Sequence, residues 1–543
     1  MSNSRNWVAL LLFIVFASIY LAAIVKIDNT NIGTTNGLWK TPMVRGWEMG
    51  SARQLDSGEW LYAPLYGFLC RLIPDRWVSY GTPAPVLTFR KMAMLNGIFG
   101  GLASAFVFLL ALRMLASVIA SFVAALAHGC AAFVIVNSIN SEDILPAYTF
   151  FVLMTILLCM YIERKRLGYL IAAGVCCAML TLLHWTLMLP ALAGAFVIGV
   201  AVLFNDRRRG WMLPIFLGAF LLSLELFVLA FGHAYSIRQI LYPSKAGASG
   251  YLGLHWTKLL FTAIGIGNYF VGGRNISDYP AAFRDANVLA WMRISWAFAA
   301  ITLAALAWAA TRRDSRITLR MLAIFGLAVF GAAEIEHLYS QPQDPQSQIQ
   351  PMFASILGVI VILGAAQRVD RAWLRRAAVF GLGALFIWEG GYNTLLLMTQ
   401  LGADSRFMKT AAELAQTFPA ENTVLVTNGW EEWNAWIYIE NFGGDGARFA
   451  ERNIGLANGF VEHPGISPAA AADLMARQIQ ESLKHGRVVA NVIWAGSSDD
   501  FAASLTSLVN PAEARMYTSR LKSAFHTGRT WITSAGKFVE LQN

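Results

Sequence analysis

The chain has few charged residues and few cysteines. Charged residues make up 14% of its 543 residues, whereas a soluble globular domain has about 25%. Hydrophobic residues make up 56%, and the mean hydropathy is +0.50, so most of the chain is suited to hydrocarbon rather than to water. The five cysteines include no Cys-x-x-Cys pair and none follows residue 401, which excludes a disulfide framework or a cysteine metal site.

Several motifs of soluble enzymes are also missing. The segment after residue 401 has no Gly-rich phosphate loop, no G-x-S-x-G nucleophile motif and no paired histidine ligands. The net charge of +9 does not indicate nucleic-acid binding, because the basic residues form short runs that each follow an apolar segment.

Apolar segments of about 20 residues, the length that crosses a bilayer as a helix, recur along the chain. We expect about eleven spans, namely 7–25, 92–112, 114–136, 144–162, 168–184, 186–204, 211–232, 288–310, 321–338, 351–367 and 377–398. The first has no small-residue cleavage site before Lys26, so it is interpreted as a retained signal anchor. These segments predict a polytopic α-helical membrane protein.

The loops between these segments divide by charge. With the N-terminus in the cytoplasm, every short inner loop is basic, through Arg113; Arg164, Lys165 and Arg166; Arg207, Arg208 and Arg209; Arg312, Arg313, Arg316 and Arg320; and Arg368, Arg371, Arg375 and Arg376. The short outer loops 137–143, 184–185 and 339–350 contain no lysine or arginine. Because cytoplasmic loops carry the excess of basic residues, we expect the N-terminus in the cytoplasm and the long loops 26–91 and 233–287 outside it.

Two parts of the long outer loops are apolar. Segment 60–73 is aromatic, with Pro64 near its start, and is interpreted as an interfacial helix on the outer leaflet. Segment 252–270 carries His255, Lys258 and Asn268, and is either re-entrant or interfacial, or a hairpin of two crossings. A single extra crossing is excluded, because it would invert every later loop and break the charge rule.

From Gly402 the composition becomes that of a soluble domain. Buried strands are predicted at 423–427 and 488–494, helices at 468–485 and 499–525, and a terminal strand or hairpin at 530–541. We therefore expect a transmembrane domain over 1–401, followed by a periplasmic α/β domain over 402–543. The tryptophan-rich stretch 430–436 either contacts a periplasmic partner or is a helix that packs on the domain core or the membrane surface.

Side chains capable of chemistry gather on the outer face. They are Glu48, Asp56, Glu142, Asp143, His184, Glu336 and His337. Carboxylates near a membrane are costly unless they function or pair, and here they can act as a general base or as metal ligands. Structural interpretations also stand: Glu48 as a solvated loop residue, Glu142 and Asp143 as a helix cap, and His184 as an interface anchor.

The first outer loop contains an acid, an Ala-containing helix, a Gly turn and a Pro-Leu-Tyr segment in this order, at Glu48, 52–55, Gly58 and 63–66. A second acidic turn, 141–143, opens the fourth span. This order resembles the GT-C superfamily of polyprenyl-phosphate-sugar-dependent glycosyltransferases, in particular bacterial members related to protein O-mannosyltransferases and aminoarabinose transferases. The chain departs from the family pattern in having Glu48 where aspartate is common, and in having no arginine in loop 339–350.

The resemblance implies a glycosyltransferase of a bacterial inner membrane. It would move a hexosyl or pentosyl group, with inversion, from a polyprenyl phosphate to a hydroxyl of a glycan, lipid or protein on the periplasmic face. Glu48 would be the general base. Glu142 and Asp143, with His184 nearby, would orient the acceptor or bind Mg²⁺ or Mn²⁺, and no other cofactor is implied. Cations of the second long loop would neutralise the leaving phosphate, and these are Lys245, Lys258, Arg274 and Arg284. Asp56, Glu336 and His337 would line the same cavity.

Two other classes stay open. A transporter or flippase for a lipid-linked or polar solute would use the same acids as coupling sites, although the chain has no internal repeat and its acids lie at helix ends rather than at the midplane. A membrane-anchored scaffold would bind a periplasmic partner through segment 430–436.

Overall fold

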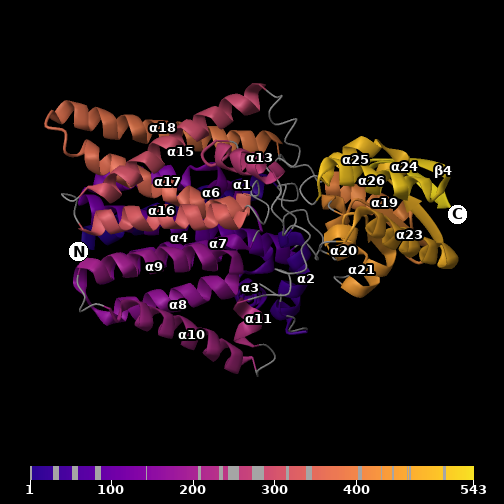
Figure 1. Cartoon of the computed structure of the whole chain (residues 1–543), viewed down its shortest axis with the longest axis horizontal. Coiled ribbons are helices and arrows are strands. Elements are labelled where there is room, and N and C mark those ends of the chain that lie inside the picture. The colour runs from indigo at the N-terminus through magenta and orange to yellow at the C-terminus, as the bar shows by residue number, and fades with distance from the viewer. Residues whose placement is uncertain are drawn as a thin grey trace.

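The structure is a computed structural model of the chain. It describes residues 3–543 except 28–35, 52–54, 56–58, 80–86, 142, 206–209, 232–235, 242–255, 272–285, 313–316, 338–344, 401–405, 430, 443–444, 462, 464–465 and 506–508. A helical bundle carries the N-terminus and a smaller α/β domain carries the C-terminus, at the opposite end of the molecule (Figure 1).

Each predicted span corresponds to a helix of the bundle, α5 and α6 together making one. These helices are α1 (Asn3–Ile27), α4 (Leu87–Leu115), α5 (Val118–Gly129), α6 (Ala132–Ser138), α7 (Ile144–Arg164), α8 (Leu167–Leu183), α9 (Met188–Asn205), α10 (Met212–Ala230), α15 (Ala286–Thr311), α16 (Ile317–His337), α17 (Pro345–Ala366) and α18 (Ala372–Gln400). Eight described helices are long and apolar enough to cross a membrane, and nine if the pair α5–α6, bent by 65°, is one broken span. The other two predicted spans are α8, with 17 residues, and α18, whose 29 residues include Glu389 and Asn393. The polytopic helical class is confirmed.

Helices α4, α7 and α17 form the centre of the bundle, because most of their side chains are buried. Close packing there depends on small residues, as in other helix pairs within membranes. A Cβ at Gly101 of α4, for example, would lie 2.8 Å from the backbone nitrogen of Ala17 in α1. The peripheral helices instead expose large apolar side chains such as Leu222 and Ile301, which suits a surface that faces lipid.

Short helices cover the end of the bundle next to the C-terminal domain (Figure 1). They are α2 (Asn36–Met49), α3 (Tyr62–Arg71), the 3-10 helix η1 (Asp75–Trp77), α11 (Ile237–Leu241) and α13 (Trp256–Gly267). Helix α3 buries Tyr62 and Tyr66 but exposes 58% of Phe68, the two-sided pattern expected of the interfacial helix predicted at 60–73. Helix α13 has 12 residues and is about 18 Å long, too short to cross a bilayer.

The helical backbone is interrupted on both sides of the short helix α6, from the end of α5 to the start of α7, and side chains from other helices bind carbonyl oxygens of this segment. Hydrocarbon offers no water to such groups, so the protein itself must satisfy them. The donors are Tyr20 to Gly129 (2.7 Å), Asn393 to Cys130 (3.0 Å), Asn96 to Asn140 (2.6 Å) and Tyr62 to Ser141 (3.1 Å). Helices α1, α18, α4 and α3 are thereby joined to the segment that ends at Asp143.

The C-terminal domain is built on a five-stranded mixed sheet. Its strands are β1 (Thr423–Thr427), β2 (Asn453–Gly455), β3 (Arg487–Ala490), β4 (His526–Thr533) and β5 (Gly536–Gln542), in the order β2-β1-β3-β5-β4. Strand β1 pairs in parallel with β2 and β3, whereas β5 is antiparallel to β3 and β4. All five side chains of β1 are buried, as its continuous apolar pattern predicts for a central strand.

Helices cover both faces of this sheet. They are α19 (Arg406–Thr417), α20 (Glu432–Glu440), α21 (Gly446–Arg452), α22 (Asn458–Val461), α23 (Pro468–His485), α24 (Val492–Ala495), α25 (Ser498–Ser504) and α26 (Pro511–Ser523). One core includes residues of α23, α25 and α26, and the other includes residues of α19 and α20. Residues 432–436 of the tryptophan-rich stretch lie in α20, whose Trp433 and Trp436 are buried in the second core.

Two details of the predicted domain were wrong. The strand predicted over 488–494 ends at Ala490, because Val492 has a φ of 48° and begins a short helix. Such a backbone angle is rare for a β-branched residue, so the apolar pattern alone could not predict it. The helix predicted over 499–525 is two helices, α25 and α26.

Candidate functional site

Four polar side chains meet at the end of the bundle that faces the C-terminal domain, and we call them the histidine cluster. They are Lys40, Glu59, Asp143 and His184. The Lys40 ammonium contacts Oε2 of Glu59 and Oδ2 of Asp143. On the other side of the carboxylates, Nε2 of His184 lies 3.5 Å from Oδ1 of Asp143 and 4.0 Å from Oε1 of Glu59. The Asp143 side chain is fully buried.

Each member of the cluster lies in or near the terminal turns of a helix. Lys40 is in the second turn of α2, and Glu59 lies three residues before α3. Asp143 directly precedes α7, but its side chain makes no capping hydrogen bond, so capping alone does not explain this residue. His184 directly follows α8, and its Nδ1 lies 2.7 Å from the hydroxyl of Thr186, which leaves Nε2 directed at the carboxylates.

The cluster combines donors that suit a divalent metal ion. Ligand atoms of Glu59, Asp143 and His184 all lie within 4.8 Å of one another. Two carboxylates and an imidazole fit Mn²⁺ or Zn²⁺ better than Mg²⁺, which prefers oxygen ligands alone. Lys40 supplies one positive charge against two carboxylates, so the cluster retains a net negative charge that attracts a cation. The other residue predicted for a metal, Glu142, lies outside the described residues.

Glu48 belongs to a second group, which we call the Glu48 cluster. Its Oε1 lies 2.5 Å from the ammonium of Lys91, and its Oε2 accepts a hydrogen bond of 2.6 Å from Thr88. Lys91 also pairs with Asp75 at 2.6 Å. The Glu48 side chain is only 10% exposed and lies on α2, so it is not a solvated loop residue.

The backbone around Glu48 is held by neighbouring helices. Arg71 of α3 donates hydrogen bonds to the carbonyl oxygens of Trp47 and Glu48. Gly67 of α3 lies so close to α2 that a Cβ at this position would be 2.9 Å from the amide nitrogen of Glu48. The two clusters therefore both depend on α2, which supplies Lys40 to the histidine cluster and Glu48 to the Glu48 cluster.

The remaining predicted site residues lie elsewhere or are not described. His337 is buried beside Gln348, with its Nδ1 3.8 Å from Glu334, while Glu336 is partly exposed. Lys258 is 1% exposed in the first turn of α13. Residues outside the described part of the chain are Asp56, Lys245, Arg274 and Arg284, in addition to Glu142.

The sequence analysis missed three residues of these clusters. Lys40, Glu59 and Lys91 lie in or next to the first outer loop, where they resembled ordinary solvated charges. One feature of the sequence could have drawn attention to the two lysines. Trp39 directly precedes Lys40, and Phe89 lies two residues before Lys91, each near the start of a helix. Their pairing with carboxylates depends on contacts that no spacing in the sequence indicates.

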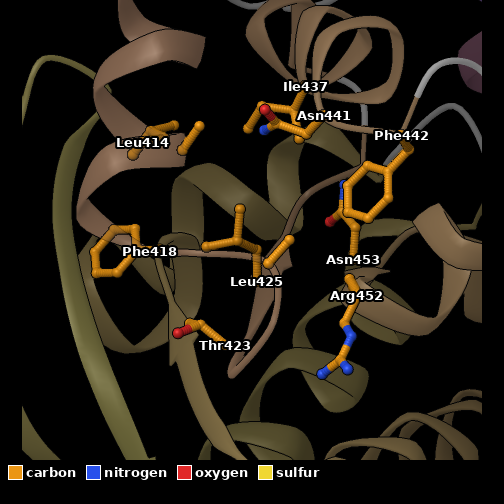
Figure 2. Close-up of a pocket in the computed structure, with 11 residues that line it drawn as sticks. Leu414, Phe418, Thr423, Leu425, Ile437, Asn441, Phe442, Arg452 and Asn453 are labelled. Carbon is orange, nitrogen blue, oxygen red and sulfur yellow. The ribbon is translucent and has the colours of Figure 1, made fainter.

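Cavities in the described residues differ in size and lining. The pocket in Figure 2, between β1 and helices α19 and α20, has a volume of about 10 Å³ and is lined mainly by apolar side chains such as Leu414 and Phe418. It holds no more than one water molecule. A groove of about 620 Å³ runs between α23 and the edge strand β2. A second groove, of about 550 Å³, is lined almost wholly by apolar side chains of α1, α5 and α18.

Comparison with known proteins gives matches in structure only. No protein-family model and no curated protein sequence matches the chain. Two crystal structures of ArnT from Cupriavidus metallidurans match it, one bound to undecaprenyl phosphate (TM-score 0.52) and one in the apo state (TM-score 0.50). Both are 12% identical to the chain, and each comparison covers 99% of this chain and 98% of ArnT. The chain therefore has the fold of ArnT.

Proposed function

We propose that the chain is a GT-C-type glycosyltransferase that moves a sugar from a polyprenyl phosphate to an acceptor hydroxyl at the periplasmic face of the inner membrane. The observation that carries this proposal is the pair of lysine–carboxylate clusters at one end of an ArnT-like bundle, next to the C-terminal domain (Figure 1). Such a site offers carboxylates to a hydroxyl and ammonium groups to a phosphate.

In the proposed reaction the acceptor oxygen attacks the anomeric carbon from the face opposite the phosphate. The bond between the anomeric carbon and the phosphate oxygen breaks, and polyprenyl phosphate leaves with the bonding electrons. Glu48 takes the hydroxyl proton, and the configuration at the anomeric carbon inverts. Because Oε1 of Glu48 pairs with Lys91, the base becomes available when Lys91 turns to the negatively charged donor phosphate.

The histidine cluster would hold the second substrate group. Asp143, with Glu142, would orient the acceptor hydroxyl, or would bind Mn²⁺ together with Glu59 and His184. A bound divalent ion would supply positive charge to the leaving phosphate. Lys40, Lys245, Lys258, Arg274 and Arg284 are further candidates for binding this phosphate.

The prenyl tail of the donor would lie in the apolar groove between α1, α5 and α18. Its volume of about 550 Å³ and its apolar lining, which includes Phe16, Leu126 and Ile387, suit a hydrocarbon chain. All three helices that form it expose large apolar side chains, such as Leu11, Ile119 and Ile387, so a lipid tail would enter from the bilayer.

Turnover by the purified protein tests this proposal. Wild type is incubated with a mixed pool of polyprenyl-phosphate sugars and acceptors, beside Glu48→Gln and the matched control Glu163→Gln at the opposite end of the bundle. Wild type and Glu163→Gln are expected to release polyprenyl phosphate, and Glu48→Gln at least about 100-fold more slowly, since a positioned base contributes 10²–10⁴-fold. Release by Glu48→Gln at the wild-type rate would remove Glu48 from the mechanism. No release from any donor, with lipid or solute movement in liposomes instead, would favour a transporter.

A further inference from the structure

Two aromatic side chains of the membrane domain reach into the C-terminal domain. The ring of Trp39 in α2 lies 4.9 Å from that of Tyr438 and 5.4 Å from that of Phe449, centroid to centroid. Phe89, in the first turn of α4, lies 5.9 Å from Trp436 at an interplanar angle of 69°. Phe89 and Trp436 are at most 2% exposed, and both rings belong to the core that also contains Phe418 and Leu425. The C-terminal domain is therefore joined to the bundle by an apolar core.

Both rings are close in the chain to residues that form the candidate site. Trp39 directly precedes Lys40, and Phe89 lies between Thr88 and Lys91. Neighbouring residues of a helix point about 100° apart, so the same turn presents one side chain to the C-terminal domain and another to the site. The Lys40 ammonium contacts Glu59 and Asp143. Thr88 and Lys91 bind the two oxygens of Glu48.

The first turns of α2 have little helical stability of their own. The helix has only 14 residues and contains Pro42, which has no amide hydrogen to donate to the preceding turn. Helices this short are marginal in isolation and depend on packing against other elements. The second half of α2 packs on α3, where Gly67 lies against Trp47. The first half, which carries Lys40, packs on α20 of the C-terminal domain through Trp39.

We propose that Trp39 and Phe89 are positioning residues through which the C-terminal domain holds both clusters in place. Docking on Tyr438 and Phe449 fixes the turn that places Lys40 on its carboxylates, and docking of Phe89 on Trp436 fixes the turn that places Thr88 and Lys91 on Glu48. The expected effect of this docking on turnover rests on the proposed function, whereas its expected effect on the stability of α2 does not. The C-terminal domain then supports the active site through these rings, although the rings themselves contact no substrate.

The test replaces Trp39 and measures two quantities in the full-length protein. Trp39→Ala removes the docking ring, and Trp39→Phe keeps an aromatic ring at the same position. Trp494→Ala is the matched control, because Trp494 lies in α24, packs on Phe525 and belongs to the other core of the C-terminal domain, which contains neither Phe89 nor Trp436. The first quantity is amide hydrogen exchange in peptides that cover 36–49 and 87–95, and the second is kcat and KM for the polyprenyl-phosphate sugar.

We expect Trp39→Ala to speed exchange in 36–49 at least tenfold while the peptides of β1 and β3 keep their wild-type protection. The same variant should lower kcat at least tenfold, and Trp39→Phe should stay within threefold of wild type in both quantities. Trp494→Ala should change neither the exchange of α2 nor kcat. The rescue by phenylalanine and the local pattern of exchange separate positioning from general loss of the fold.

Wild-type exchange in 36–49 of Trp39→Ala would overturn the proposal, and so would faster exchange together with wild-type kcat. A wild-type protein that turns over no polyprenyl-phosphate sugar contradicts the proposed function instead. In that case the exchange measurement alone decides whether the C-terminal domain holds α2, so the two failures are distinguishable.

Discussion

Replacing Lys40 with methionine leaves the carboxylates of Glu59 and Asp143 buried without their ammonium partner. Methionine keeps most of the volume of the lysine stem, so the change removes a charge rather than opening a cavity. The two carboxylates lie within 4.8 Å of each other, and unit charges at that distance repel by about 3–4 kcal/mol at an effective dielectric constant of ~20. Removing one partner of a buried ion pair commonly costs about 3–5 kcal/mol. We expect Lys40→Met to lower the free energy of unfolding by a similar amount.

A divalent cation should restore much of this loss, because His184 and the two carboxylates offer it three ligand atoms. An ion present at 100 times its dissociation constant stabilises the folded state by about 2.7 kcal/mol. Mn²⁺ should therefore stabilise Lys40→Met more than wild type, in which Lys40 already neutralises one carboxylate. Adding His184→Ala to Lys40→Met should reduce this Mn²⁺ effect.

Equilibrium unfolding in mixed detergent micelles, followed by near-ultraviolet circular dichroism, measures these free energies. The matched control is Arg113→Met, which breaks an ion pair of 3.0 Å with Glu163 at the opposite end of the bundle. That pair is partly exposed to solvent, and we expect its loss to cost roughly 1 kcal/mol or less. If Lys40→Met were as stable as wild type without metal, the ion pairs of the histidine cluster would not stabilise the fold and the reasoning would be refuted.

Two further predictions concern packing and pH. Gly67→Ala places a methyl group against α2 near Glu48, so we expect a loss of about 1–3 kcal/mol in the same unfolding assay, together with reduced turnover. Gly168→Ala, which meets open space, is its control and should be close to neutral. In the C-terminal domain, hydrogen bonds from Arg520 lower the pKa of Asp473 below its ordinary value of 3.8, so this pair stabilises the folded state above that pH and less as the pH falls through the lowered pKa. Hydrogen exchange of α23 and α26 in full-length protein should therefore differ between wild type and Asp473→Asn at pH 6, and the difference should shrink below pH 4; a constant difference would contradict the assignment.

Hydropathy and charge in the sequence were sufficient to predict the class of fold. Each span is a continuous local signal, so its helix could be located within a few residues. The strand at 423–427 and the helix at 468–485 were predicted with the bounds that the structure has. In contrast, β2 has three residues, too few for a pattern of alternation to be recognised.

The candidate site was less predictable because its pairs join distant parts of the chain. The sequence placed Asp143 and His184 on the same face, and the structure brings them within 3.5 Å. It gave no indication that Lys40 reaches Asp143 across 103 positions, because that contact depends on how α2 lies across the bundle. The roles of Glu48 and Asp143 in catalysis stay predictions.

The irregular backbone between α5 and α7 has a consequence for how this chain tolerates change. Four carbonyl oxygens there are bound by side chains of four different helices, so each of Tyr20, Tyr62, Asn96 and Asn393 has a partner fixed by a shared segment. A shift of that segment by one residue would break these bonds together, and no bilayer water would replace them. Substitutions among relatives should therefore be correlated at these four positions, and insertions between residues 129 and 143 should be rare, even though the stretch contains only the seven-residue helix α6.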